Sequence, residues 1–201
     1  MGERLSGGNT AIALLANSIA TGTAIAALIL TLQAISGAHF NPAVTLLSAL
    51  RGETKWGDVV PYSLAQATGA LLGVLCAHTM FSLARYSLSH HVRSGAPQFF
   101  SEGIATLGLL LVIAGCSRFR SPATPYAVAA YITGAYWFTS STSFANPAVT
   151  LARSLTDTFA GIRPADVPGF LLGQLAGLAV AVLLCRWLFP PQLSAESGGG
   201  R

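Results

Sequence analysis

Charged residues are so sparse in this chain that five long stretches contain almost none, and their lengths restrict what the chain can fold into. Only 9% of its 201 residues are charged, whereas a soluble domain carries about 25%. A helix that crosses a membrane needs about 20 mostly apolar residues. We therefore predict an all-helical integral membrane protein. The stretches are residues 5–50, 59–84, 94–117 (with Glu102 alone inside), 121–152 and 167–185.

Two of these stretches are too long for one crossing, and each ends in the same motif. Residues 5–50 and 121–152 close on Asn-Pro-Ala-Val-Thr, which begins at Asn41 and again at Asn146. Asn is a favoured helix N-cap, and Pro suits the first helical position. Each stretch therefore predicts a full crossing followed by a short helix that enters the membrane only partway. The non-helical backbone next to such a helix is tolerated inside the membrane only where protein or a water-filled cavity satisfies its hydrogen bonds.

The number of crossings between the motifs predicts how the two short helices face one another. Three are expected, at about residues 59–83, 99–116 and 124–141. An odd number brings the short helices in from opposite sides of the membrane, so both N-termini point at the midplane. Each N-terminus carries about half a positive charge from the helix dipole. Inverted repeats with half-helix ends at the midplane are a known plan for solute pathways.

The duplication extends beyond the motif. "YSLAQATG" at residues 62–69 matches "FLLGQLAG" at 170–177, which aligns Gln66 with Gln174. We expect a single channel domain over residues 1–201. Its first repeat covers about 1–84, its second about 94–189, and a disordered tail about 191–201.

The motifs and their surroundings resemble the aquaporin, or major intrinsic protein, family over nearly the whole chain. The resemblance is carried by two Asn-Pro-Ala boxes (Asn41, Pro42, Ala43 and Asn146, Pro147, Ala148), by "SGAHFNPAVT" and by Glu102 in "EGIATLGLLL". It implies a bundle of six crossings plus two half-helices, usually tetrameric with one pore per subunit. Only five crossings are found here. The counterpart of Glu102 in the first repeat would lie 105 residues earlier, which is before Met1. We therefore expect that the first crossing of the family pattern is missing.

The resemblance also implies a selectivity constriction. Matching by distance from the boxes gives Thr21, Gly134, Ser143 and Val149. Water-selective members typically carry Phe, His, a small residue and Arg at these places, so this constriction should be wider and without a fixed positive charge. The set and the run "NPAVTLARSLTDTFAGI" are most similar to bacterial channels of the glycerol- and metalloid-permeable branch associated with arsenic resistance. Arg153 lies one turn beyond Val149, and we expect it to pair with Asp157 along a helix.

Two further residues are candidates for the pathway. Acids inside a membrane are costly and usually functional, and the resemblance makes Glu102 a hydrogen-bond acceptor that braces a half-helix loop rather than a proton carrier. The side chain of His39, just before the first box, is either a donor that lines the pore or a packing group. The cysteines and histidines lack the spacing of a metal or redox site, so we expect no metal and no cofactor.

The sequence therefore predicts a passive channel for small neutral solutes, namely water, glycerol, arsenite and similar metalloid hydroxides. A water-selective channel, a coupled secondary transporter and a non-conducting truncated subunit are the alternatives. An enzyme is not expected, because no set of nucleophile and base is found. The partners expected are the lipid bilayer, the solutes and three further copies in a homotetramer, in a cell membrane such as a bacterial inner membrane. The net charge of +4 is scattered and predicts no nucleic-acid surface.

Overall fold

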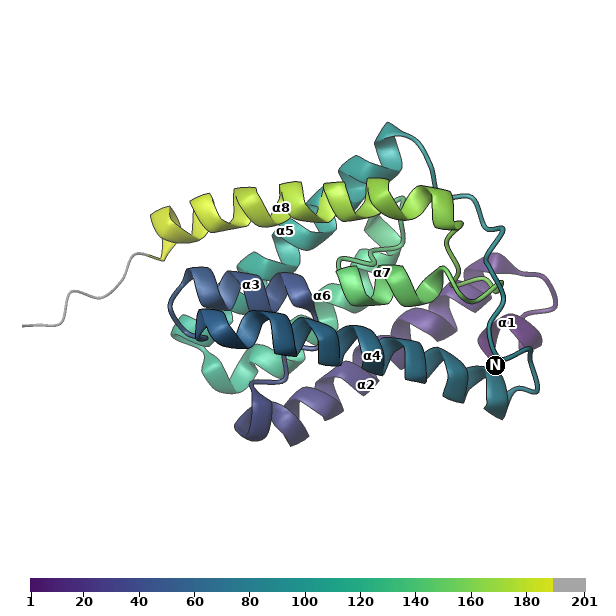
Figure 1. Cartoon of the computed structure of the whole chain (residues 1–201), viewed down its shortest axis with the longest axis horizontal. Helices are drawn as coiled ribbons and strands as arrows, with labels where there is room; N and C mark the ends of the chain where they lie inside the picture. The colour runs from purple at the N-terminus through teal and green to yellow at the C-terminus, as the bar shows by residue number, and fades with distance from the viewer. Residues whose placement is uncertain (190–201) are drawn as a thin grey trace, which may run out of the picture.

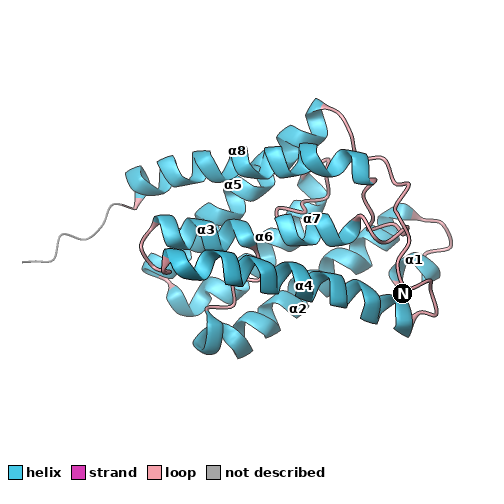
Figure 2. Ribbon diagram, in the orientation of Figure 1, coloured by secondary structure: helices cyan, strands magenta, loops and turns pink. Residues whose placement is uncertain are grey.

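The computed structural model describes residues 1–189, and every regular element within that range is helical (Figures 1 and 2). The expected disordered tail, residues 191–201, lies outside the described residues. The elements are α1 (Gly2–Leu5), α2 (Thr10–Ser36), α3 (Pro42–Leu50), α4 (Trp56–Met80), α5 (Ala96–Phe119), the 3-10 turn η1 (Ser121–Ala123), α6 (Thr124–Phe138), α7 (Pro147–Arg153), the 3-10 turn η2 (Pro164–Asp166) and α8 (Val167–Leu188).

The two short helices begin where the motifs predicted. In the middle of the molecule α3 and α7 lie end to end, with α8 on one side of them and α4 on the other (Figure 1). Both start at the proline of a box and hold nine and seven residues. The prediction of an all-helical bundle with two half-helices is therefore confirmed.

Within residues 1–189, four helical segments are long and apolar enough to cross a membrane: α2, α4, α5, and α8 together with η2. The fifth expected crossing, residues 124–141, is shorter than predicted. There α6 ends at Phe138 and holds 15 residues, a rise of only about 22 Å. It ends because Thr139 is extended and a run of serine and threonine follows. Short hydroxyl side chains bond to nearby backbone and so compete with the helix.

The core forms where α5 packs along α8 and where α2 packs along α6. Glycines allow the first contact, because a Cβ on Gly173 would collide with the carbonyl of Phe99 and one on Gly177 with that of Gly103. Such small residues let membrane helices approach closely. By contrast, none of the most apolar window of α4 is buried. The close pair of α5 and α8 thus contrasts with α4, which leaves a long apolar face open.

Candidate transport pathway

Each half-helix is capped by the asparagine of its own box. The Asn41 Oδ1 accepts from the backbone N–H of Ala43 at 2.9 Å. The Asn146 Oδ1 accepts from those of Ala148 and Val149 at 3.0 and 3.3 Å. These are N-cap bonds, which satisfy N–H groups that have no partner inside a helix. The motif therefore fixes where both half-helices begin.

The amide nitrogens of the same two asparagines join the halves. The Asn41 Nδ2 donates to the carbonyl of Ala145 at 2.7 Å, and the Asn146 Nδ2 donates to that of Phe40 at 2.9 Å. Each acceptor is the residue directly before the other box, so the two bonds form a reciprocal clasp. An amide nitrogen carries two hydrogens. One hydrogen on each asparagine is therefore left without a protein acceptor among the described residues.

The loops that lead into the boxes have an unusual backbone. Positive φ angles occur at Ala38 and Phe40 before the first box, and at Thr142, Ser143 and Ala145 before the second. Non-glycine residues adopt this conformation rarely, and such strain gathers at functional sites. The positions 105 residues apart agree closely, with φ of 49° and 51° for Ala38 and Ser143. The inverted repeat therefore extends to the backbone torsions.

The second loop is braced by Glu102, which is fully buried. Its carboxylate oxygens accept from the backbone N–H groups of Phe144 and Ala145 at 2.8 and 2.9 Å. Gln174 donates to the same carboxylate at 2.6 Å and to the Thr150 hydroxyl at 2.8 Å. The acid thus holds the loop before α7 against α5 and α8.

The first loop has a simpler support. Gln66 donates to the Thr45 hydroxyl at 3.0 Å, as its counterpart Gln174 does to Thr150. The His39 Nδ1 lies 3.1 Å from the same hydroxyl, and its ring lies 5.8 Å from that of Tyr62. Among the described residues, no side chain accepts from the N–H groups of His39 and Phe40, which correspond to the two that Glu102 holds in the second loop.

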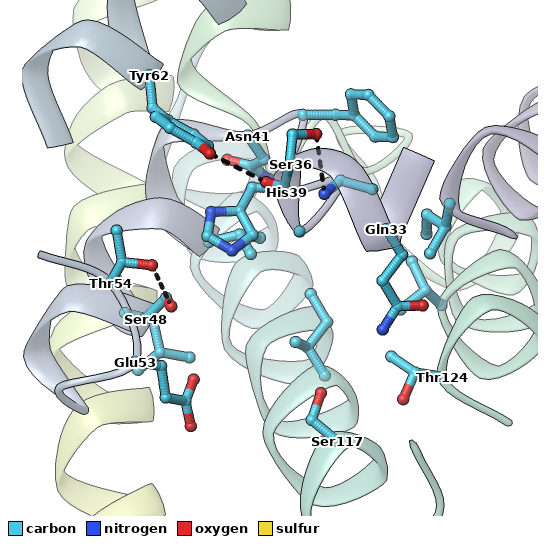
Figure 3. A pocket seen from close by; sticks show the side chains of 18 of the residues that line it. Gln33, Ser36, His39, Asn41, Ser48, Glu53, Thr54, Tyr62, Ser117 and Thr124 are labelled. Carbon is cyan, nitrogen blue, oxygen red and sulfur yellow. Dashed lines mark hydrogen bonds between the residues drawn. The ribbon is translucent and has the colours of Figure 1, made fainter. Parts of the chain in front are cut away.

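A cavity of 620 Å³ reaches the meeting point of the half-helices, because both Asn41 and Asn146 line it. Figure 3 shows Tyr62, His39 and Asn41 on one side of this cavity and Gln33, Ser117 and Thr124 on the other. The charged residues among its described lining all come from residues 51–58. The rest of the described lining is therefore uncharged, and it includes His39, whose Nδ1 lies beside the Thr45 hydroxyl.

The four predicted constriction residues come from three helices and one loop. Thr21 lies on α2, Gly134 on α6, Ser143 in the loop before the second box and Val149 on α7. Two other side chains, those of Tyr136 and Arg153, link the three helices. The Thr21 Oγ1 lies 3.2 Å from the hydroxyl of Tyr136, which accepts from the Arg153 Nη2 at 3.0 Å.

The expected helix pair between Arg153 and Asp157 is wrong. Helix α7 ends at Arg153, so the two residues do not share a helix. Asp157 instead accepts from the backbone N–H of His90 and pairs with its imidazole, both at 2.9 Å. The guanidinium of Arg153 turns toward Tyr136 and lies 4.3 Å from the centre of the Phe144 ring.

Arg93 is a buried residue that the sequence did not identify. It lies in the connection between α4 and α5 and is 6% exposed. Its guanidinium donates to the carbonyls of Ser141, Phe159 and Gly161, at 2.7 to 3.2 Å. Burial, and to a smaller extent the charge of Arg153, lowers the pKa of Arg93 to about 10. The sequence shows only an arginine in a polar loop, so nothing in it signals this position.

An all-helical bundle in which two half-helices meet end to end at a cavity has the architecture of a membrane channel. The chain belongs to the major intrinsic protein family, whose sequence pattern matches residues 3–137, so the predicted resemblance is confirmed. It is 51% identical over 181 residues to a protein named aquaglyceroporin AqpS from Rhizobium meliloti (strain 1021), covering 90% of this chain and 78% of that one.

Two other relatives are more distant. The chain is 33% identical to the probable aquaporin AqpM of Archaeoglobus fulgidus, over 82% of this chain and 72% of that protein. It is 32% identical to a glycerol uptake facilitator protein of Streptococcus pneumoniae (strain ATCC BAA-255 / R6), over 56% of this chain and 54% of that protein.

Proposed function

We propose that this chain is a passive channel for water, glycerol and small metalloid hydroxides such as arsenite. The observation that carries the proposal is the cavity that ends at Asn41 and Asn146, each with one amide hydrogen available to a solute. Both half-helix N-termini point at this place, and their positive dipole ends oppose the entry of cations and protons. The names of two relatives, an aquaglyceroporin and a glycerol uptake facilitator, support the choice of solutes.

The constriction proposed for this channel is wide. Its four positions, Thr21, Gly134, Ser143 and Val149, carry no aromatic ring and no arginine. Glycerol and arsenite, which is mostly neutral As(OH)₃ at neutral pH, present hydroxyl groups to a lining that contains amide, hydroxyl and apolar groups. We place the protein in a cell membrane, the inner membrane of a bacterium, as a homotetramer. The exposed apolar side chains along α2, α4 and α8 suit contact with lipid or with neighbouring subunits.

Stopped-flow light scattering on vesicles that contain the full chain tests the proposal. Vesicles are mixed with glycerol or arsenite at raised osmolarity, with and without an ion gradient. A passive channel gives swelling that is faster than in empty vesicles and independent of the gradient. Flux of water alone would identify a water-selective channel, and flux that requires the gradient would identify a coupled transporter. Absence of flux for every solute would identify a non-conducting subunit.

A single substitution tests the proposed width. Val149→Arg brings into the constriction a planar group with five hydrogen-bond donors. It should reduce glycerol and arsenite flux relative to water flux by at least about tenfold, the lower end of what one steric misfit discriminates. Val149→Leu is the matched control, because it adds volume at the same position of α7 without adding hydrogen-bond donors or charge. Equal loss of water and glycerol flux in Val149→Arg would contradict the proposed constriction.

A further inference from the structure

The guanidinium of Arg153 is held in one place by two aromatic residues. It donates to the hydroxyl of Tyr136 at 3.0 Å and lies over the ring of Phe144 at 4.3 Å. Tyr136 is itself 3% exposed, and its hydroxyl lies 3.2 Å from the Oγ1 of Thr21. A cation over an aromatic face is stabilised by the ring's quadrupole. One row of side chains therefore runs from α7 through α6 to α2, across the region of the proposed constriction.

Arg153 also lines a cavity. Its volume is 580 Å³, and Val149, Asn17 and Ala20 line it too. Residues four apart on a helix lie on one face, so Arg153 stands above Val149 at a rise of about 6 Å. Within residues 1–189, no carboxylate forms an ion pair with Arg153, and Tyr136 is the only hydrogen-bond acceptor of its side chain. Its charge therefore has no paired carboxylate among the described residues, on the wall of a cavity that Glu3 and Arg4 also line.

A second arginine nearby has a different role. The guanidinium of Arg93 lies 5.0 Å from the centre of the same Phe144 ring. Its donors, however, are taken by the carbonyls of Ser141, Phe159 and Gly161. Arg93 thus positions the loops on both sides of α7, and of the two cations Arg153 is the one open to a solute.

We propose that Arg153 is a specificity-determining residue of this channel. Fixed by Tyr136 and Phe144, it supplies the positive charge and hydrogen-bond donors that Val149 lacks. Because it stands one turn beyond the constriction, it rejects cations while the constriction keeps room for neutral hydroxylated solutes. This inference rests on the proposed function and assigns the residue that discriminates by charge.

Urea and the guanidinium ion provide the test, because they have nearly the same planar shape and differ in charge. Tracer uptake of each is measured in vesicles that contain the full chain, and the ratio of guanidinium to urea flux is compared between variants. Arg153→Gln should raise this ratio by about fivefold or more, the factor expected from one unit charge at about 4 Å even in an aqueous dielectric. Arg153→Lys keeps the charge and should keep the ratio low.

Two further variants make the result specific. Arg85→Gln removes an exposed arginine from the connection between α4 and α5 and should leave the ratio unchanged. Tyr136→Phe removes only the hydroxyl that fixes the guanidinium and should raise the ratio by a smaller factor. It also serves as the test if Arg153→Gln does not insert into vesicles. If urea passes but the ratio of guanidinium to urea flux is unchanged in the Arg153 and Tyr136 variants, this inference alone is overturned. No flux of water, glycerol or urea through the unaltered protein would contradict the proposed function as well.

Discussion

The two halves of the molecule share the structure around their boxes and differ in the helices that support it. In each half an asparagine caps a half-helix and donates to the loop of the other half. In each half a threonine one turn later accepts from a glutamine of the following long helix. The duplicated sequence therefore produces a duplicated centre.

The support beyond this centre is unequal. In the second half, α8 packs along α5, and Glu102 of α5 holds two N–H groups of the loop before α7. In the first half, the described residues contain no helix that packs along α4 as α5 packs along α8. The corresponding loop has no carboxylate. We infer that the motif determines where a half-helix begins. In the second half, a buried acid and a close helix pair additionally fix the loop before it.

The largest expected effect comes from removing the acid that only the second half has. Glu102→Ala removes the acceptor of three buried N–H hydrogens, namely two on the backbone and one of the two on the Gln174 amide. At roughly 1–3 kcal/mol for each, the free energy of unfolding should fall by at least about 3 kcal/mol. Thermal melting in detergent, followed by tryptophan fluorescence, measures the loss. Glu53→Ala is the control, because its ion pair with Arg51 lies at the surface and such pairs contribute about 0–1 kcal/mol. Equal melting of both variants would show that the acid is not a brace.

A matched pair of glycines tests the unequal packing directly. Gly177 and Gly69 are aligned in the two halves. A Cβ on Gly177 would collide with the carbonyl of Gly103, whereas one on Gly69 meets no other atom within 4 Å. Gly177→Ala should therefore destabilise by about 1–3 kcal/mol through overpacking. Gly69→Ala should be neutral, or stabilising by up to about 1 kcal/mol through helix propensity.

The same melting experiment in vesicles sharpens this comparison. If Gly69→Ala lowers the melting temperature as much as Gly177→Ala does, the open face of α4 is covered in the membrane by another helix or subunit. If only Gly177→Ala has an effect, that face is in contact with lipid.

The elements could be predicted from the sequence because their signals are local. Charge-free stretches located α2, α4, α5 and α8, and Asn-Pro located where α3 and α7 begin. The contacts of Arg93, Tyr136 and Arg153 could not be predicted, because they depend on where loops settle after packing. The expected pairing of Arg153 with Asp157 assumed that α7 continued for another turn. The actual partner of Asp157 is His90, 67 residues earlier, and no periodicity connects them.

The two aligned glutamines should differ in importance. Gln174 is 1% exposed and donates to both Glu102 and Thr150, whereas Gln66 is half-buried and donates to Thr45 alone. A hydrogen bond to a charged group contributes about 1.5–3 kcal/mol and one to a neutral group about 0.5–1.5 kcal/mol. Gln174→Leu should therefore lower the melting temperature more than Gln66→Leu. A larger loss in Gln66→Leu would place the more important support in the first half.

The smallest effect concerns the connection between the halves, which is docked on the second half. Hydrogen bonds from the backbone N–H and the ring of His90 lower the pKa of Asp157 below its ordinary value of 3.8. A carboxyl group with a lowered pKa in the folded state stabilises the fold above the unfolded value, and this contribution is lost as pH falls through the folded value. Asp157→Asn should therefore melt slightly below the unaltered protein at pH 7, and the difference should shrink as pH falls below 3.8 and vanish below the lowered folded pKa. Ser87→Ala, which removes the hydroxyl that accepts from the Asp157 N–H without changing charge, should give a difference independent of pH. A pH-independent difference for Asp157→Asn as well would show that the carboxylate's charge does not hold the connection on the second half.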